Sequence, residues 1–487
     1  MSEPAPPTQS IAASFRDPAG STFRYQGRIL RIVNAIGAAD LEAFLASEAG
    51  EKMMAAGSVI PTRRLDAAEC RALLTDPAVH ELYNARGGQM ILEHERIDFP
   101  SFPYEWTAEM LHGAGVLTLD VAQALLSDGL GLKDGTPYNI LFRGPEPVFI
   151  DVLSFERRQP GDATWLPYAQ FIRTFLLPLL ANQVYGLGLD QALTTRRDGL
   201  DPEEVYRWSR PWQRLLPPFF SLVSMPTWLG RKHKQDDTTI YRKKALGDPE
   251  KARYVLEHVL SGLRRSLQRL KPAASKRSVW SDYMTTNNNY TLDHFQGKQR
   301  FVEEALTEFP SRSVLDVGCN TGHFSAIAAR SGARVVALDY DPAVLGDVWR
   351  NALEEKLEIL PLAVNLARPS PGTGWLNQEG ASFLDRARGN FDAVLMLAVI
   401  HHMLVTERVP LAAILDLAAE LTTNLLVIEF VGPSDSMFQR LTRGREELHK
   451  DLTPELFETL CGRHFVIVRM QHVEGTARRL YLLRKRA

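Results

Sequence analysis

The chain has 487 residues, of which 45% are apolar and 23% charged, a composition typical of two or three globular domains. Its formal net charge of −2 gives no general basic field to attract nucleic acid. The three cysteines are odd in number and far apart, which excludes a disulfide framework and a CxxC metal pair. We therefore expect a cytoplasmic protein without a cysteine-bound metal and with no nucleic-acid partner.

The first 20 residues are rich in Pro, Ser and Ala, and they predict a disordered lead-in instead of a signal peptide. The most apolar run, residues 171–189, is interrupted by Arg173, Pro178 and Asn182. It is too short and too polar to span a bilayer, so it predicts a buried helix. We expect a protein that is not integral to a membrane.

Residues 131–156 place Asp134, Asn139 and Asp151 around a predicted strand–turn–strand hairpin. Turns favour carboxylates, so a hairpin with acids at its turns would explain the pattern without any ligand. The spacing resembles the catalytic loop of protein and small-molecule kinases. That resemblance implies that Asp134 is a catalytic base and that Asn139 and Asp151 hold magnesium bound to ATP.

This stretch also departs from the kinase pattern. Leu132 and Lys133 replace the usual His-Arg, and Val-Leu follows Asp151 in place of Phe-Gly. No Gly-rich loop precedes it, and Arg31 is the nearest candidate for a phosphate-pairing cation. A charged helical pattern stops at Pro272, where we place a domain boundary. We predict a kinase-like α+β domain over residues 21–270, a linker over 271–282 and a second domain over 283–487.

Near-continuous apolar strands alternate with helices in the second domain, and this predicts a parallel α/β sheet covered on both faces. The chain ends in two strands that predict an antiparallel hairpin at one sheet edge, which completes a Rossmann-like sheet of seven strands. The predicted strands span residues 313–318, 333–341, 357–367, 391–403, 424–431, 464–473 and 478–486.

The loop after the first of these strands runs from Gly318 to Gly322, directly behind Asp316. It lacks the third glycine of a dinucleotide loop and the Lys of a phosphate loop. The Asp316 carboxylate would repel a phosphate and attract an ammonium group. Asp339 ends the next strand, a position that commonly holds ribose hydroxyls. S-adenosylmethionine (SAM) combines ribose, ammonium and sulfonium without phosphate.

The stretch Asp316-Val-Gly-Cys-Asn-Thr-Gly322 resembles the first motif of class I SAM-dependent methyltransferases, with Asn320 in place of the middle glycine. Asn tolerates left-handed backbone conformations, so the loop can keep its shape. The alternative is a Rossmann-like sheet with a degenerate loop that binds no SAM. The resemblance implies a set of cofactor-binding residues, which comprises Asp316, Gly318, Asn320, Gly322, Asp339, Tyr340 against the adenine, Asn365 at its amino group and Tyr290 in a lid.

Three residues are candidates for the chemistry. His401 and His402 end the predicted fourth strand, where a histidine would suit a hydroxyl nucleophile that needs a base, although such a pair also shapes cofactor pockets. Glu429 ends the fifth strand and would orient the acceptor, or else cap a neighbouring turn as a structural acid. No metal-ligand spacing accompanies them.

A methyltransferase joined to a kinase-like domain also resembles bacterial enzymes that cap surface polysaccharides and some rhizobial nodulation proteins. These resemblances imply a bacterial SAM-dependent methyltransferase that methylates an oxygen of a glycan, glycolipid or small-molecule acceptor, with a front domain for substrate binding or regulation. Two alternatives stay open, a bifunctional kinase–methyltransferase that uses Mg-ATP and a non-catalytic SAM-binding scaffold.

Overall fold

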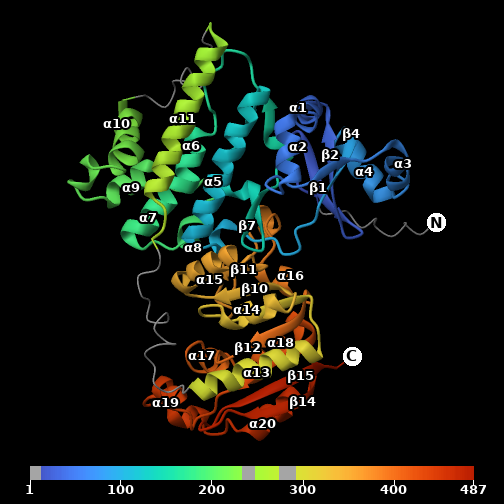
Figure 1. Cartoon of the computed structure of the whole chain (residues 1–487), viewed down its shortest axis with the longest axis vertical. Helices are drawn as coiled ribbons and strands as arrows, with labels where there is room; N and C mark the ends of the chain where they lie inside the picture. Colours follow the sequence, from blue (N-terminus) through green and yellow to red (C-terminus); the bar gives the residue numbers. More distant parts are fainter. Residues whose placement is uncertain (1–12, 233–246, 274–291, 487) are drawn as a thin grey trace, which may run out of the picture. The chain divides into compact units, whose positions relative to one another are not determined.

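The structure, a computed structural model, describes residues 13–232, 247–273 and 292–486. The chain divides into two compact units, with the main division between Lys271 and Pro272 (Figure 1). The first unit consists of Met1–Pro103, Leu111–Leu141 and Pro147–Lys271, and the second of Tyr104–Met110, Phe142–Glu146 and Pro272–Ala487.

The first unit opens with a four-stranded antiparallel sheet in the order β1-β2-β4-β3. Phe23, Leu30, Ile32 and Ile91 project from this sheet into a small core that also includes Val79. The strands are β1 (Gly20–Tyr25), β2 (Arg28–Asn34), β3 (Thr62–Arg64) and β4 (Gly88–His94), and the helices between them are α1 (Ala35–Leu45), α2 (Glu48–Ala55), α3 (Ala67–Leu73) and α4 (Pro77–Ala85).

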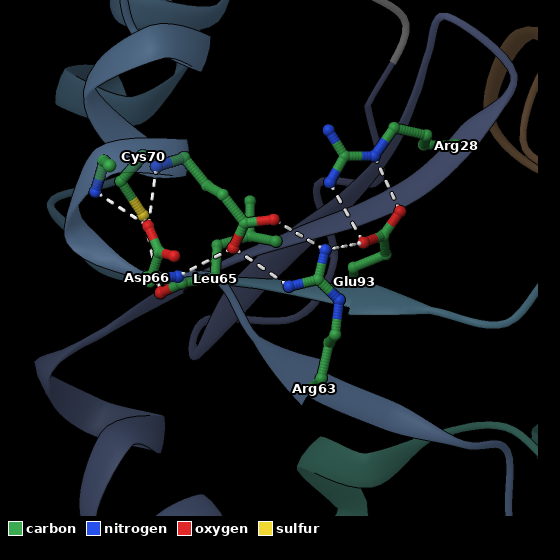
Figure 2. A network of polar contacts seen from close by, with 8 residues as sticks. Arg28, Arg63, Leu65, Asp66, Cys70 and Glu93 are labelled. Carbon is green, nitrogen blue, oxygen red and sulfur yellow. Dashed lines mark hydrogen bonds and ion pairs between the residues drawn. The ribbon is translucent and has the colours of Figure 1, made fainter.

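Ion pairs connect the strands of this sheet on the same face as the small core, next to α3 (Figure 2). Glu93 of β4 accepts from Arg28 of β2 at 2.6 Å and from Arg63 of β3 at 2.5 Å. Arg63 also pairs with Glu69 of α3 at 2.7 Å and lowers the pKa of that carboxyl to about 2. Because these side chains are partly exposed, they fix the pairing of the short strand β3 and add little stability.

Part of the predicted disordered lead-in is attached to the sheet. Ala13 forms a bridge with Phe23, and the backbone amide of Ser14 donates to the carbonyl of Thr22 at 2.9 Å. The expectation of disorder through residue 20 is therefore wrong for residues 13–20, because backbone pairing with β1 satisfies their polar groups. Residues 1–12 lie outside the described part of the chain.

The rest of the first unit is mainly helical. The predicted hairpin forms from β6 (Ile140–Arg143) and β7 (Glu146–Phe149), and β5 (Leu130–Leu132) pairs with β8 (Phe155–Arg157). The helices are α5 (Ala108–Leu125), α6 (Tyr168–Phe171), α7 (Leu177–Tyr185), α8 (Leu189–Leu193), α9 (Pro202–Trp208), α10 (Met225–Lys232) and α11 (Pro249–Arg269).

One helix among the described residues, Ala108–Asp128, is long and apolar enough to cross a bilayer by length and composition. More than half of its most apolar stretch, 56%, is buried within the protein. Core helices of globular domains share this length and composition, so this helix gives only weak evidence for a membrane span.

The second unit contains the predicted seven-stranded sheet, in the order β11-β10-β9-β12-β13-β15-β14. The first five strands run parallel and the last two form the predicted antiparallel hairpin at one edge. The strands are β9 (Ser313–Val317), β10 (Arg334–Asp339), β11 (Ile359–Ala363), β12 (Phe391–Met396), β13 (Thr422–Phe430), β14 (Phe465–His472) and β15 (Arg479–Lys485).

Helices cover this sheet because each presents an apolar stripe to it. In the first of them, Phe301, Val302 and Ala305 are buried in the same core as Val314 and Val335 of the strands. The longer helices are α13 (Leu292–Glu308), α14 (His323–Arg330), α15 (Pro342–Glu355), α18 (Leu411–Leu421) and α20 (Pro454–Cys461), and α16 (Phe383–Ala387), α17 (Ile400–Val405) and α19 (Ser436–Thr442) are shorter.

The parallel register places the chemistry-bearing residues at one edge of the sheet. Asp316 of β9 lies beside Ala337 of β10 and Leu395 of β12. The carboxyl ends of these strands therefore meet where the strand order reverses, between β9 and β12, which is where ligands of such sheets bind.

Candidate cofactor and acceptor site

The loop between β9 and α14 has the backbone shape that the sequence predicts. Gly318, Asn320 and Gly322 all adopt left-handed conformations, with φ of 73°, 49° and 78°. The backbone amides of Gly318 and Cys319 both donate to the carbonyl of Leu338 at 2.8 Å, which ties the loop to β10. Asn320 therefore takes the left-handed conformation that its side chain tolerates best among non-glycine residues.

Both glycines of the loop are also required by space. A Cβ at Gly318 would lie 3.1 Å from the Val399 side chain, and one at Gly322 would lie 2.9 Å from that of Val348. Any larger residue at either position would add contact strain to an unfavourable backbone conformation. The loop backbone at Gly318 and Gly322 is therefore closely packed and leaves no room for a side chain.

Asp316 lies at the base of the loop and is buried. The Ser325 hydroxyl of α14 donates to its carboxylate at 2.6 Å. Burial raises the pKa of Asp316 to about 6, in spite of that hydrogen bond. A ligand ammonium group beside it would favour the charged form and lower this pKa again, so the carboxylate fits a cationic ligand.

Asp339 connects the end of β10 to the loop. Its two oxygens accept from the backbone amides of Asn320 and Asp341, each at 3.0 Å. Burial raises the pKa of this carboxyl also. A carboxylate has further lone pairs for ligand hydroxyls, and the buried Asn320 side-chain oxygen has no hydrogen-bond partner among the described residues. These acceptors fit the donor groups of SAM.

Three further residues implied for the cofactor have different surroundings. Tyr340 follows Asp339 and is 58% exposed. The Asn365 amide donates to Glu407 at 3.2 Å and accepts from the backbone of Ala367 at 2.9 Å. Tyr290 lies outside the described residues. Contacts of all three with SAM stay predictions.

The two histidines lie in a helix and not at the end of a strand. Strand β12 ends at Met396, and the chain turns through Ala398, whose φ of 52° is rare for a residue other than glycine. Helix α17 then begins at Ile400 and carries both imidazoles, whose ring centres lie 4.2 Å apart. The strand that the apolar run predicted is therefore shorter, because the turn at Ala398 ends it.

His401 is fully buried, and neither of its ring nitrogens has a hydrogen-bond partner among the described residues. Burial lowers its pKa well below the ordinary value, and the neighbouring His402 and Arg478 lower it further. The imidazole is therefore neutral at physiological pH. A neutral imidazole has one nitrogen that can accept a hydrogen bond or a proton.

Glu429 at the end of β13 belongs to a buried cluster of charges. Lys298 of α13 donates to both of its oxygens, at 2.6 and 2.7 Å, and Arg478 approaches at 3.4 Å. Arg478 in turn pairs with Asp435 at 2.7 Å. The two cations of this cluster balance its two carboxylates. Glu429, which the sequence predicts at the acceptor site, is therefore held by partners from distant segments of the chain.

The sequence analysis did not identify Lys298, Arg478, Asp435 or Ser325. A signal for Lys298 existed, because it precedes Phe301, Val302 and Ala305 by three, four and seven residues and so shares their buried helix face. A cation on an apolar face needs a buried partner. Which acid would supply that partner depends on the sheet, and the sequence order does not reveal it.

The first unit brings together some of its predicted residues. Arg31 of β2 donates to Asp151 at 2.6 Å, so the candidate phosphate-pairing cation lies beside one of the predicted magnesium ligands. Lys133 donates to the carbonyl of Leu153 at 3.0 Å, and the Gln170 amide reaches Asp134 at 3.2 Å. The side-chain nitrogen of Asn139 is buried without a hydrogen-bond partner in the described chain.

Metal-binding clusters are absent from the described ranges. No group of three or more His, Cys, Asp or Glu side chains there is arranged to hold a metal ion. All three cysteines are free thiols. Nucleotide or magnesium binding in the first unit therefore stays a prediction that rests on Arg31, Asp134, Asn139 and Asp151.

Comparison with known proteins shows one similarity within the second unit and another over almost the whole chain. The methyltransferase domain family matches residues 290–451. Nodulation protein NoeA of Rhizobium meliloti (strain 1021) is 30% identical over 481 residues, which cover 98% of this chain and 96% of that protein. The similarity therefore extends through the first unit as well as the second.

Two solved structures overlap with less than half of the chain. The N-methyltransferase NodS of Bradyrhizobium japonicum WM9, in complex with S-adenosyl-l-homocysteine, is 14% identical and covers 43% of this chain and 97% of its own, with a TM-score of 0.32. The bifunctional kinase-methyltransferase WbdD is 16% identical over 44% of each chain, with a TM-score of 0.30. The chain belongs to the NoeA family of nodulation proteins and is a SAM-dependent methyltransferase.

Proposed function

We propose that the enzyme methylates a hydroxyl oxygen of a glycan, glycolipid or small-molecule acceptor in the cytoplasm. The observation that carries this proposal is His401, a buried and neutral imidazole whose two ring nitrogens lack hydrogen-bond partners among the described residues. Buried polar groups are almost always satisfied in a working protein. An acceptor hydroxyl beside His401 would supply the missing donor.

Bound SAM supplies an electrophilic methyl group on its sulfonium. Asp316 and Asp339 would hold its ammonium and ribose ends, and the bare loop at Gly318 would let it lie close to the backbone. His401 would accept the proton that the acceptor hydroxyl loses as it takes up the methyl group.

A buried, neutral His401 suits an alcohol better than an amine. Burial holds the pKa of His401 well below its ordinary value, and His402 and Arg478 lower it further, so the imidazole has a nitrogen that can accept a proton from a hydroxyl. A neutral amine carries a free lone pair and needs no base for attack. In this proposal Glu429 is a positioning residue, because Lys298 and Arg478 already engage its carboxylate.

Methyl transfer from labelled SAM to separated fractions of a cell extract tests the proposal. We expect methyl incorporation into a glycan, glycolipid or small-molecule fraction, with the label on oxygen by mass spectrometry. His401→Asn should reduce the rate by about a hundredfold, because general bases contribute on that order, and should leave SAM affinity unchanged. Label on nitrogen, or a full rate in the variant, would contradict it.

We further propose that the first unit is a kinase-like domain for substrate binding or regulation. Its support is the Arg31–Asp151 ion pair, which joins β2 to a residue two positions after the β6–β7 hairpin. Calorimetry with magnesium–ATP, with Asp151→Ala as the control, distinguishes the roles. Binding lost in the control would favour a nucleotide-binding unit, and ATP turnover lost in Asp134→Asn would favour the bifunctional alternative. No heat with either protein would eliminate nucleotide binding.

A further inference from the structure

A large apolar surface lies on the first unit, over α9, α10 and the short helical turns Gln213–Leu215 and Phe220–Ser224 that connect them. We call it the aromatic platform (α9 and α10 are labelled in Figure 1). Trp212 is 58% exposed and Leu215 66% exposed. The platform comprises Trp212, Leu215, Leu216, Phe220, Trp228 and Leu229.

Ring contacts hold the aromatic platform together. Trp228 packs edge-on against Phe220 and against Tyr206, with ring centres 6.0 and 6.5 Å apart. The Trp228 indole nitrogen also donates to the Tyr206 hydroxyl at 3.2 Å. The backbone amide of Phe220 donates to the carbonyl of Leu216 at 3.0 Å, which joins this aromatic pair to the segment that carries Trp212 and Leu215.

The helical stretch from Phe220 through α10 is apolar on two faces. Leu222, Val223 and Thr227 face the interior of the unit and are buried. The face turned to solvent carries Phe220 and Trp228, where a surface helix normally carries polar residues. Contiguous exposed apolar surfaces of this kind mark sites of protein or membrane interaction.

The charge around the aromatic platform identifies the partner. After Glu203 and Glu204 in the first turn of α9, the 26 residues from Val205 to Gly230 contain three arginines and no Asp or Glu, in a chain whose net charge is negative. Arg207 and Arg210 are exposed beside Trp208 and Trp212, and Arg214 lies over the Tyr206 ring at 4.0 Å. Tryptophan and leucine next to arginine is a composition typical of segments that lie in the interface of an anionic bilayer.

We infer that the aromatic platform docks the enzyme on an anionic membrane surface as a peripheral protein. The Trp and Leu side chains would enter the boundary between headgroups and acyl chains, where the amphipathic indole is favoured. Arg207 and Arg210 would face the lipid phosphates. The inference rests on the first unit alone and is independent of which acceptor the methyltransferase unit uses.

Sedimentation of the full-length protein with lipid vesicles tests the inference. We expect binding to phosphatidylcholine vesicles that contain phosphatidylglycerol. The affinity for vesicles of phosphatidylcholine alone should be at least about tenfold lower. Trp212→Ser combined with Leu215→Ser should lower vesicle affinity by at least about tenfold, since about two large side chains leave the bilayer. Arg207→Gln with Arg210→Gln should weaken binding to the anionic vesicles specifically.

A matched control lies in the other unit, where Trp375 and Leu376 are 64% and 69% exposed. Trp375→Ser with Leu376→Ser should leave vesicle binding unchanged. The inference is overturned if the unmodified protein binds no vesicles, or if the control pair weakens binding as much as the platform pair. It is also overturned if light scattering shows a dimer that the platform substitutions convert to monomer, because the surface would then bind a second copy of the chain.

Discussion

Lys298 and Glu429 are 131 residues apart in the sequence, yet their charged atoms lie 2.6 Å apart and their side chains are only 4% and 0% exposed. The pair joins α13 to the end of β13, so it connects the helix that covers the sheet to the edge where the acceptor is expected. Arg478 and Asp435 extend it into a neutral cluster of four charges. Its energetic role follows from its burial.

Removal of one member of this pair should destabilise the second unit strongly. Lys298→Met leaves Glu429 buried with Arg478 as its one cationic partner among the described residues, and loss of one partner of a buried ion pair costs about 3–5 kcal/mol. Urea denaturation measures the change, and added SAM identifies the transition of the SAM-binding unit by shifting it. Lys52→Met is the control, because its pair with Glu48 is 72% exposed on both sides and should matter little.

Asp316 should make SAM affinity depend on pH. Its pKa of about 6 means that the carboxylate is charged above that pH and neutral below it. SAM affinity should therefore fall about tenfold between pH 7 and pH 5, with one proton released per SAM bound at the lower pH. Titration calorimetry in buffers of different ionisation enthalpy counts that proton. Asp316→Asn should bind weakly at both values, with no such dependence.

In the absence of SAM, the Asp316 carboxyl should make the protein more stable as the pH falls, whereas SAM affinity decreases as the pH falls. Its pKa is raised from 3.8 by burial, so the folded state binds the proton more tightly than the unfolded state. Its contribution to the free energy of unfolding should therefore increase as pH falls through about 6 and level off below about 4. In a comparison of the unmodified protein with Asp316→Asn, a difference that does not change with pH would show that Asp316 is not the titrating group.

Alanine substitutions at two glycines should distinguish the cost of backbone strain from the cost of steric crowding. Gly322 and Gly332 both have positive φ, 78° and 94°, but a Cβ at Gly322 would lie 2.9 Å from Val348, whereas one at Gly332 would meet nothing within 4 Å. Gly332→Ala should cost about 1 kcal/mol for backbone conformation alone. Gly322→Ala should cost about 1–3 kcal/mol more, because Val348 must move. Equal costs in denaturation experiments would remove the packing argument for the loop.

The sequence predicted the sheet of the second unit because its strands are nearly continuous apolar runs separated by helices with clear ends. It also predicted the left-handed loop, since Asp316 and the two flanking glycines constrain what Asn320 can do. The two histidines were misplaced because an apolar run from Phe391 to Met403 contains no glycine or proline to reveal the turn at Ala398.

Other parts of the site depend on tertiary structure. Arg478 precedes the last strand, and only the insertion of β15 between β13 and β14 brings it to Asp435. The aromatic platform was overlooked for a related reason, because apolar residues near Trp212 and Trp228 read equally well as core. Burial decides that choice, and periodicity alone does not.

The central claim is that the loop from Asp316 to Gly322 binds SAM. Titration of SAM into the full-length protein, Asp316→Ala and Gly318→Arg by calorimetry tests it most directly, with Gly332→Arg as a control because that position opens to space. We predict binding by the unmodified protein and by Gly332→Arg, and no measurable binding by the two loop variants. Unchanged SAM affinity in both loop variants would contradict the account.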